Sequence, residues 1–489
     1  MCSSDLLDPA TDLPLLTAGT KQWPTPSGTG AEENIDDLWH AAVNSRGGFF
    51  SAADPEEFAE QLSATLQQII GRTGSAAAIA TNSTRLNADT YVYQARFDSK
   101  DWRGELLGFK VDGTTGAIID ADTSTTALDP TWEAAKLLDT KSALAYNVRN
   151  IFTHEAADSD GDGEVGVDLL WDATHTPPAS IMTAIKHGDS DTVGQRRLNF
   201  IRGDDTYEIG NDPAGTFRKR VSVLGDIVNS DPFFVGQQDY GFNILPGTEG
   251  SSYITYRSSN AYKNRPGVVY VGVNDGMLHA FREDTGYELF AFIPEAVQAD
   301  LWKLSDPDYS HQFYVDGPSA GKDAYINNTW KSVLLGTTGA GGKSVFALDV
   351  TDPENFSKSD VMWEFSTDDD DADTDGTPDG DLGYTIGQPT LARMANGAWA
   401  AVFGNGYSST NNRAVLFIVD VATGALIRKI DTGVGDGSSP NGLATPILVD
   451  YNNDKIADRA YAGDLLGNMW AFDLRSEERR VGKECRSRW

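Results

Sequence analysis

Nine residues near the end of the chain, Asp450-Tyr-Asn-Asn-Asp-Lys-Ile-Ala-Asp458, place oxygen atoms at intervals that suit a hard cation. Carboxylate or amide side chains stand at the first, third, fifth and ninth places, and a backbone carbonyl is available at the seventh. This is the spacing by which a short loop wraps Ca²⁺. The alternative is a solvated acidic turn, because Asp and Asn are also common turn residues. The predicted ligands are Asp450, Asn452, Asp454, Ile456 through its carbonyl, and Asp458.

The loop departs from a full EF-hand at two places. Lys455 holds the sixth place, where glycine is expected, and Tyr461 holds the twelfth, where a bidentate glutamate is expected. Apolar, strand-like runs stand on both sides, at 444–449 and 459–462. We therefore predict that the acidic residues lie on a rigid connection between two strands.

Two further acidic stretches share this spacing and are candidate calcium loops. One carries Asp371, Asp373, Asp375 and Asp379 at places one, three, five and nine. The other carries Asp158, Asp160 and Asp162 at places one, three and five, with the carbonyl of Glu164 at the seventh. Both lie in polar insertions, so a flexible acidic loop is the competing interpretation.

Motifs of catalysis are incomplete. Gly317–Gly321 matches G-x-S-x-G around Ser319, but a nucleophile elbow needs a helix after it, and the following residues predict a turn and a strand. Gly339–Ser344 lacks the leading glycine of a phosphate loop and predicts a β-hairpin. The six histidines are scattered without an H-E-x-x-H motif, which leaves zinc catalysis without support. We predict no enzyme and assign no catalytic or organic-cofactor residue.

Composition excludes several partners. The net charge is −33, from 72 acidic and 39 basic residues, and it repels the phosphates of nucleic acids and anionic membranes. No run of about eighteen apolar residues predicts a transmembrane segment. Both cysteines lie in terminal stretches, 1–6 and 475–489, that resemble translated sequencing adapters and are set aside. A bridge between Cys2 and Cys485 is the alternative.

Between these ends the chain divides by pattern. Residues 7–33 are rich in Pro, Gly and Thr and predict a linker. A short helical segment is expected over 34–78, with its clearest helix at 54–70, where Asp54 can cap and Pro55 can open the first turn. Strands of period two then dominate over 86–474, interrupted by a helical insertion at about 130–220.

A hydrophobic strand followed by a turn recurs five times. The copies are 106–116, 278–286, 345–350, 416–424 and 469–474, and several of the turns contain Thr-Gly. Self-similar units of this kind predict the blades of a β-propeller, in a fold that is mainly β. An array of β-sandwiches would explain the repeat less well. We expect five tryptophans to pack within or between blades, with quinone stacking as the alternative. They are Trp39, Trp330, Trp363, Trp399 and Trp470.

Longer motifs resemble the PilC/PilY family of type IV pilus-associated proteins. They are Leu224-Gly-Asp-Ile-Val-Asn-Ser230, Val271-Gly-Val-Asn-Asp-Gly-Met-Leu-His-Ala-Phe281, Phe403-Gly-Asn-Gly-Tyr407 and Asp458-Arg-Ala-Tyr-Ala-Gly-Asp-Leu-Leu-Gly-Asn468. Residues 36–44 and 50–52 also look like that family. The resemblance implies a quinoprotein-like β-propeller, preceded by a von Willebrand A-like region that is missing here and closed by strands that follow Leu474.

The resemblance also implies a function. The family is exported to the pilus tip or outer-membrane surface of Gram-negative bacteria, where it promotes pilus assembly and twitching motility by opposing retraction and adheres to host or abiotic surfaces. Minor pilins are the expected partners, and the calcium loop at 450–458 would tune extension against retraction. The alternatives are a quinone-dependent dehydrogenase, which shares the propeller architecture, and a structural surface propeller without calcium dependence.

Overall fold

The computed structural model describes residues 9–24, 40, 78–81, 90–122, 124, 128–140, 146–158, 161–211, 213, 215–475 and 481–483. The chain forms two units, 1–75 and 76–489. In the first, helix α1 (Pro9–Thr17) occupies part of the stretch predicted as linker. Proline is tolerated at the first helical position, which Pro9 holds, but Pro14 lies inside the helix and opposes it, so helix propensity alone does not account for α1. Apart from the helical His40, residues 34–77 of the predicted helical segment lie outside the described residues.

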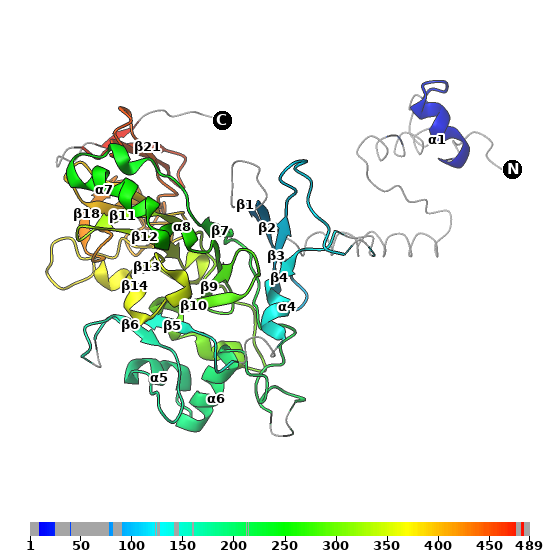
Figure 1. The fold of residues 1–489 in the computed structure, drawn as a ribbon, viewed down its shortest axis with the longest axis horizontal. Helices are drawn as coiled ribbons and strands as arrows, with labels where there is room; N and C mark the ends of the chain where they lie inside the picture. Colours follow the sequence, from blue (N-terminus) through cyan, green and yellow to red (C-terminus); the bar gives the residue numbers. More distant parts are fainter. Residues whose placement is uncertain are drawn as a thin grey trace. The chain divides into compact units, whose positions relative to one another are not determined.

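Five sheets follow one another along the second unit, and we call them blades 1 to 5 (Figure 1). Within each blade, strands adjacent in sequence pair antiparallel, as propeller blades do. The fold is therefore mainly β and the predicted propeller is confirmed. The strands are β1 (Ala78–Thr81), β2 (Tyr91–Asp98), β3 (Arg103–Lys110) and β4 (Trp132–Glu133) in blade 1; β7 (Phe233–Val235), β8 (Val268–Val273), β9 (Met277–Arg282) and β10 (Glu288–Ile293) in blade 2; β11 (Ala320–Ile326), β12 (Thr329–Thr337), β13 (Val345–Asp349) and β14 (Val361–Phe365) in blade 3; β15 (Thr390–Arg393), β16 (Trp399–Gly404), β17 (Val415–Asp420) and β18 (Leu426–Asp431) in blade 4; and β19 (Ile447–Val449), β20 (Arg459–Gly463), β21 (Met469–Asp473) and β22 (Val481–Lys483) in blade 5.

The five sequence repeats coincide with one structural position. They form β3, β9, β13, β17 and β21, the third strand of each blade. Three of these strands, β9, β13 and β17, are buried along almost their whole length and consist mainly of apolar residues. The first blade begins at Ala78, before the predicted boundary at 86, because the four residues of β1 are too few to show a period-two pattern.

An insertion between β4 and β7 widens blade 2. Strands β5 (Ile151–His154) and β6 (Gly166–Asp168) extend this sheet to six strands, since β5 pairs in parallel with β10. None of the described helices is long and apolar enough to cross a membrane. The remaining helices are α4 (Ala134–Asp139), α5 (Ala179–Lys186), α6 (Asp191–Ile201), η1 (Phe242–Ile244), α7 (Gly247–Ser258), α8 (Asn260–Asn264), α9 (Glu295–Gln298), η2 (Leu301–Ser305), η3 (Gly339–Gly341), η4 (Pro353–Asn355), η5 (Lys358–Asp360) and η6 (Thr367–Asp369).

Tryptophans on fourth strands join one blade to the next. Trp132 donates its indole N–H to the carbonyl of Glu283 in blade 2 at 2.8 Å, and Trp363 donates to that of Val421 in blade 4 at 2.9 Å. Each indole packs on the glycine of a Thr-Gly turn, Gly286 or Gly424. Trp330, Trp399 and Trp470 are buried as well. The predicted packing role is confirmed for these residues, and Trp39 lies outside the described part of the chain.

Blade 5 includes a strand from the stretch that was set aside as foreign. Residues 481–483 form β22, which pairs with β21 through Phe472↔Val481, Ala471↔Gly482 and Trp470↔Lys483. A ladder uses only backbone groups, so an unpaired strand edge accepts an extended segment of almost any sequence. Composition alone could not anticipate this pairing.

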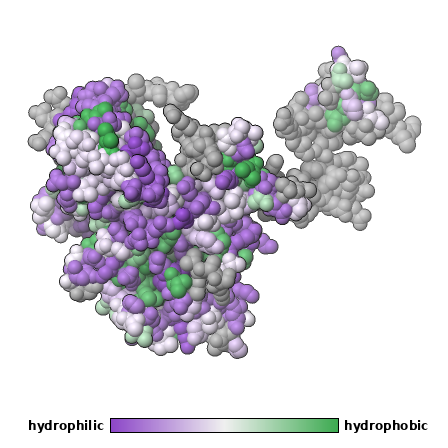
Figure 2. All heavy atoms as spheres, viewed as in Figure 1, coloured by the Kyte–Doolittle hydropathy of each residue, from purple (hydrophilic) through white to green (hydrophobic). Residues whose placement is uncertain are grey.

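His279 is packed inside blade 2. It is fully buried on β9, with Nδ1 2.7 Å from Glu288 and Nε2 3.1 Å from Asp275. Burial opposes its charge, but the two carboxylates outweigh burial and raise the pKa of His279 to about 9. Arg149 also pairs with Glu288, at 2.6 Å, and ties the insertion to blade 2. On the face shown in Figure 2, hydrophilic residues predominate and hydrophobic ones gather in small areas.

The tryptophan–glycine contact between blades 3 and 4 generates a stability prediction. Gly424 has φ +75°, and an added Cβ would lie 2.8 Å from Trp363 Cβ. Gly424→Ala therefore combines left-handed strain with overpacking, and we expect it to lower the free energy of unfolding by about 3 kcal/mol in urea titrations. Gly433 has φ +72° and open space around it, so Gly433→Ala is the matched control and should cost only about 1 kcal/mol. Equal losses would contradict the interblade role of the contact.

Candidate calcium-binding loops

All three Asp-rich loops connect strands. Residues 450–458 join β19 to β20 in blade 5, which confirms the predicted strands on either side. Residues 371–379 lie in the connection from blade 3 to blade 4, and 158–164 lie between β5 and β6. Asp160 is outside the described residues, so the third loop is described without it.

The three loops share a left-handed backbone conformation at two places. In each, the fourth and sixth residues have positive φ: Asn453 (+58°) and Lys455 (+70°), Thr374 (+57°) and Gly376 (+83°), and Gly161 (+76°) and Gly163 (+84°). Left-handed residues at these two places curl the chain tightly. Lys455 thus adopts the conformation for which glycine is usual at the sixth place, and the sequence departure noted above does not change the path of the loop.

Backbone N–H groups orient the carboxylates in the same way in each loop. The first-place carboxylate accepts from the N–H groups of the fifth and sixth residues, at 3.2 and 2.8 Å for Asp450, 3.2 and 2.8 Å for Asp371, and 3.0 and 3.0 Å for Asp158. The fifth-place carboxylate accepts from the N–H of the seventh residue at 2.7 to 2.9 Å. A carboxylate has about four lone-pair positions, so these bonds leave others for a cation.

The ninth place distinguishes two loops from the third. Tyr451 N–H donates to Asp458 at 2.8 Å, and Ala372 N–H donates to Asp379 at 2.9 Å. The loops at 450–458 and 371–379 are therefore two copies of one nine-residue structure. The ninth residue of the other loop is Gly166, which offers no side-chain oxygen.

Three carboxylates converge in the loop at 371–379. One oxygen each from Asp371, Asp373 and Asp375 lies within 4.8 Å of the others, a grouping that could hold a metal ion. In the loop at 450–458 the third place is Asn452, whose amide donates to Asp454 at 2.9 Å. That loop carries one negative charge fewer among these places.

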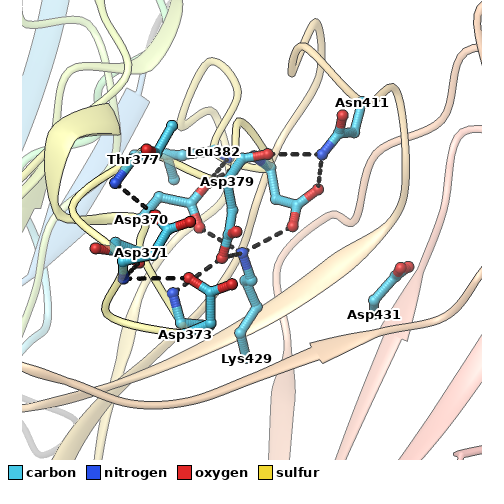
Figure 3. Close-up of polar contacts among 12 residues, drawn as sticks. Asp370, Asp371, Asp373, Thr377, Asp379, Leu382, Asn411, Lys429 and Asp431 are labelled. Atoms are coloured by element: carbon cyan, nitrogen blue, oxygen red, sulfur yellow. Dashed lines mark hydrogen bonds and ion pairs between the residues drawn. The ribbon is translucent and has the colours of Figure 1, made fainter.

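Lysines that are distant in the sequence approach two of the loops, and no local sequence pattern marks either of them as a partner. Lys429 on β18 places Nζ 2.7 Å from Asp370, 2.6 Å from Asp379 and 2.8 Å from Asp381 (Figure 3). Burial opposes its charge, but hydrogen bonds to the three carboxylates outweigh burial and raise the pKa of Lys429. Hydrogen bonding to Lys429 also lowers the pKa of Asp379.

The other two loops meet cations differently. Lys358 hydrogen bonds to Asp162 and lies 3.4 Å from Glu164. Near the loop at 450–458, Arg475 lies 3.8 Å from Asp458, beyond hydrogen-bonding distance. The loops at 371–379 and 158–164 thus each have a lysine as a close counter-ion. The loop at 450–458 has a longer and weaker ion pair.

The remaining motifs form no catalytic arrangement. Ser319 is buried and directly precedes β11, with no helix behind it. Residues 339–341 form η3 in the β12–β13 hairpin, as predicted, and the nearby Lys343 donates to the carbonyl of Ser408 at 2.8 Å. Trp330 lies against Phe242 inside the core, at a centroid distance of 5.6 Å. These contacts are those of packing residues.

The family model of the PilY1 beta-propeller domain matches residues 224–484. The chain belongs to the PilY1 family. A type IV pilus biogenesis factor PilY1 of Pseudomonas aeruginosa is 39% identical over 473 residues, which cover 94% of this chain and 38% of the relative. A PilY1 homologue of Xylella fastidiosa is 36% identical and covers 91% of this chain and 32% of its own length. The chain thus spans under two fifths of these relatives.

A solved structure provides a further likeness. The C-terminal domain of Pseudomonas aeruginosa PilY1 is 46% identical over 49% of this chain and 45% of that domain, with a TM-score of 0.41. The family that the motifs predicted is confirmed by the match of the family model and by the curated relatives.

Lys429 generates a prediction for this PilY1 family member. Lys429→Met leaves three carboxylates facing one another, one of them on the fully buried Asp370. We expect the free energy of unfolding, measured in urea with EDTA at pH 7, to fall by about 3 kcal/mol. The loss should shrink towards pH 4, because the carboxylates then become protonated.

Lys331→Met is the control for this variant. Lys331 forms one pair with Asp349 at 2.7 Å and is 38% exposed, so its removal should cost under about 1 kcal/mol. A loss from Lys429→Met no larger than that of the control would show that Lys429 does not hold the connection between blades 3 and 4.

Proposed function

We propose that the protein is a calcium-regulated type IV pilus biogenesis factor that acts at the pilus tip or outer-membrane surface, opposes pilus retraction and serves as an adhesin for host or abiotic surfaces. Membership of the PilY1 family and the printed names of the relatives support the pilus role. The observation that carries the calcium part is the shared nine-residue loop, whose side chains are held in place by backbone N–H groups. Minor pilins are the proposed partners.

The main calcium site is the loop at 450–458. Asp450, Asn452, Asp454 and Asp458 supply side-chain oxygens, and Ile456 supplies its carbonyl; calcium takes six to eight oxygen ligands, so water fills the rest. The ion would offset the repulsion among three carboxylates. These residues offer the oxygen ligands that a hard cation prefers, and backbone N–H groups orient the carboxylates of Asp450, Asp454 and Asp458.

The loop is also joined to the neighbouring blade. Ile456 forms a parallel bridge with Arg393 of β15, and Ala457 N–H donates to the carbonyl of Arg393 at 2.9 Å. Ordering the loop would therefore brace blade 5 against blade 4. Calcium would thus regulate the protein by making the propeller stiffer between blades 4 and 5. Such a role requires no chemical reaction.

We propose that the two other loops bind calcium more weakly. In the loop at 371–379, Asp379 would be shared between the ion and Lys429, which already contacts it at 2.6 Å. In the loop at 158–164, Lys358 would have to leave Asp162. Both ions would compete with an ammonium group, whereas the described residues of the loop at 450–458 form the longer ion pair with Arg475, at 3.8 Å.

Titration calorimetry tests the three sites. Asp454→Ala combined with Asp458→Ala removes two ligands, and we expect the number of calcium ions bound to fall by one, because two fewer carboxylates leave the loop short of ligands. Asp375→Ala should remove a second, weaker site. Asp436→Ala, which deletes a lone carboxylate from an exposed turn, should leave the titration unchanged. A stoichiometry unaltered by the double variant would refute calcium at 450–458.

Pilus counts test the cellular role. In the full-length protein, we expect the variant with Asp454→Ala and Asp458→Ala to give fewer surface pili than the parent in cells that can retract pili. In cells without the retraction motor the two proteins should give equal numbers, because the loop acts only against retraction. Asp436→Ala is again the control. A deficit of the same size in both strains would assign the loop to assembly and overturn the retraction role.

A further inference from the structure

A cavity of about 250 Å³ lies where blade 1 meets the segment that leads into blade 2. One wall is the β2–β3 hairpin, residues 100–103, and another is the segment 218–226. A bridge between Arg103 and Gly225 and a hydrogen bond from Gly104 N–H to Leu224 O, at 3.2 Å, hold these walls together. The cavity is separate from the three Asp loops.

Basic residues gather here in a chain with almost twice as many acidic as basic ones. The cations that line the cavity are Lys100, Arg103, Arg218, Lys219 and Arg220. Arg220 already donates to Glu208 at 2.8 Å and to the carbonyls of Phe200 and Asp204. The other four are therefore the ones that decide what the cavity can bind.

Arg218 is the least satisfied of these cations. Its guanidinium lies over the ring of Tyr309, 4.1 Å from the centroid, and makes no side-chain hydrogen bond or ion pair to any described residue. Its Nε is buried. Burial lowers the pKa of Arg218, which means that its surroundings do not fully offset its charge. A buried donor without an acceptor is unfavourable. A ligand oxygen that accepts from Arg218 would therefore add a hydrogen bond without breaking an existing one.

The other cations are also available. Arg103 approaches three carboxylates only at 3.8 to 4.0 Å, and its buried Nε has no acceptor among the described residues. Lys100 and Lys219 are exposed at the rim, and neither ammonium has an ion pair within the described chain. Both of these walls, the hairpin 100–103 and the segment 218–226, thus offer positive charge towards the cavity.

The carboxylates in the same walls are mostly engaged elsewhere. Asp226 accepts from Asn274 at 2.7 Å and from His311 at 2.9 Å. Asp275 accepts from His279 and from the N–H of Gly225, each at 3.1 Å. Only Asp101 has no such partner, with one oxygen buried and unbonded. The groups that face the cavity without partners are therefore chiefly cationic.

We propose that this cavity binds a small anion with a carboxylate or phosphate group, with Arg218 as the principal donor and Lys100 and Lys219 at its mouth. A guanidinium presents its N–H groups in a plane that matches both oxyanions, and its stacking on Tyr309 fixes that plane in advance. The bound anion would link the hairpin of blade 1 to the entry of blade 2. The proposal does not depend on calcium or on the pilus role.

Calorimetry with inorganic phosphate and with succinate tests the proposal on the whole chain at low salt. We expect at least one of them to bind, and Arg218→Met to weaken that binding at least about tenfold, because a charge-assisted hydrogen bond is lost. Tighter binding of phosphate would identify a phosphoryl ligand, and tighter binding of succinate a carboxylate ligand. Added salt should weaken either.

Two further variants keep the test decisive if Arg218→Met does not fold. Lys100→Gln with Lys219→Gln changes only exposed residues and should also weaken binding several-fold. Lys263→Met removes an ammonium that lies outside this cavity and should leave binding unchanged. The proposal is overturned if neither anion binds at millimolar concentration, or if the Arg218 and double-lysine variants bind as well as the parent.

Discussion

Repulsion among carboxylates is the physical constraint on which the functional parts of this protein depend. The net charge is −33, yet each Asp loop holds several carboxylates within one tight turn. Two such charges about 4 Å apart repel by roughly 1 kcal/mol in water and by about 4 kcal/mol near a protein surface. Backbone N–H groups offset part of this repulsion in all three loops, and Lys358 and Lys429 offset more in two. A bound cation would offset the repulsion that remains.

The blades provide the rigidity that such loops need. A strand on each side fixes where a loop begins and ends, and the third strands of blades 2, 3 and 4 are buried almost throughout. Indole-to-turn contacts such as Trp363 with Gly424 then hold one blade against the next. Loops mounted in this way keep their oxygens in place before any ion arrives, which lowers the entropic cost of binding.

Local features were predictable from the sequence, and long-range ones were not. Each of the five repeats is a short segment, and the strands beside 450–458 and the spacing of Asp450, Asn452 and Asp454 are also set by neighbouring residues. The local sequence pattern therefore predicts them. Lys429 lies 50 residues from Asp379 along the chain, and nothing in its own strand marks it as a partner. The parallel pairing of β5 with β10 likewise joins residues about 140 apart, which no local pattern encodes.

The contacts around Arg393 connect the loop at 450–458 to more than one blade. Its backbone bridges Ile456, and its side chain pairs at 3.1 Å with Glu249 on α7, a helix that packs over blade 3. Glu249 also accepts from the indole of Trp399 at 2.6 Å. A change in the order of the loop would thus reach blade 4 through the backbone and α7 through one ion pair. Because these partners are mostly buried, a shift at one of them cannot be absorbed by solvent and must be met by the packing of the next. Order in the loop at 450–458 is therefore coupled to the packing of blade 4 and α7. A regulatory ion bound by the loop would act by making this part of the propeller stiffer.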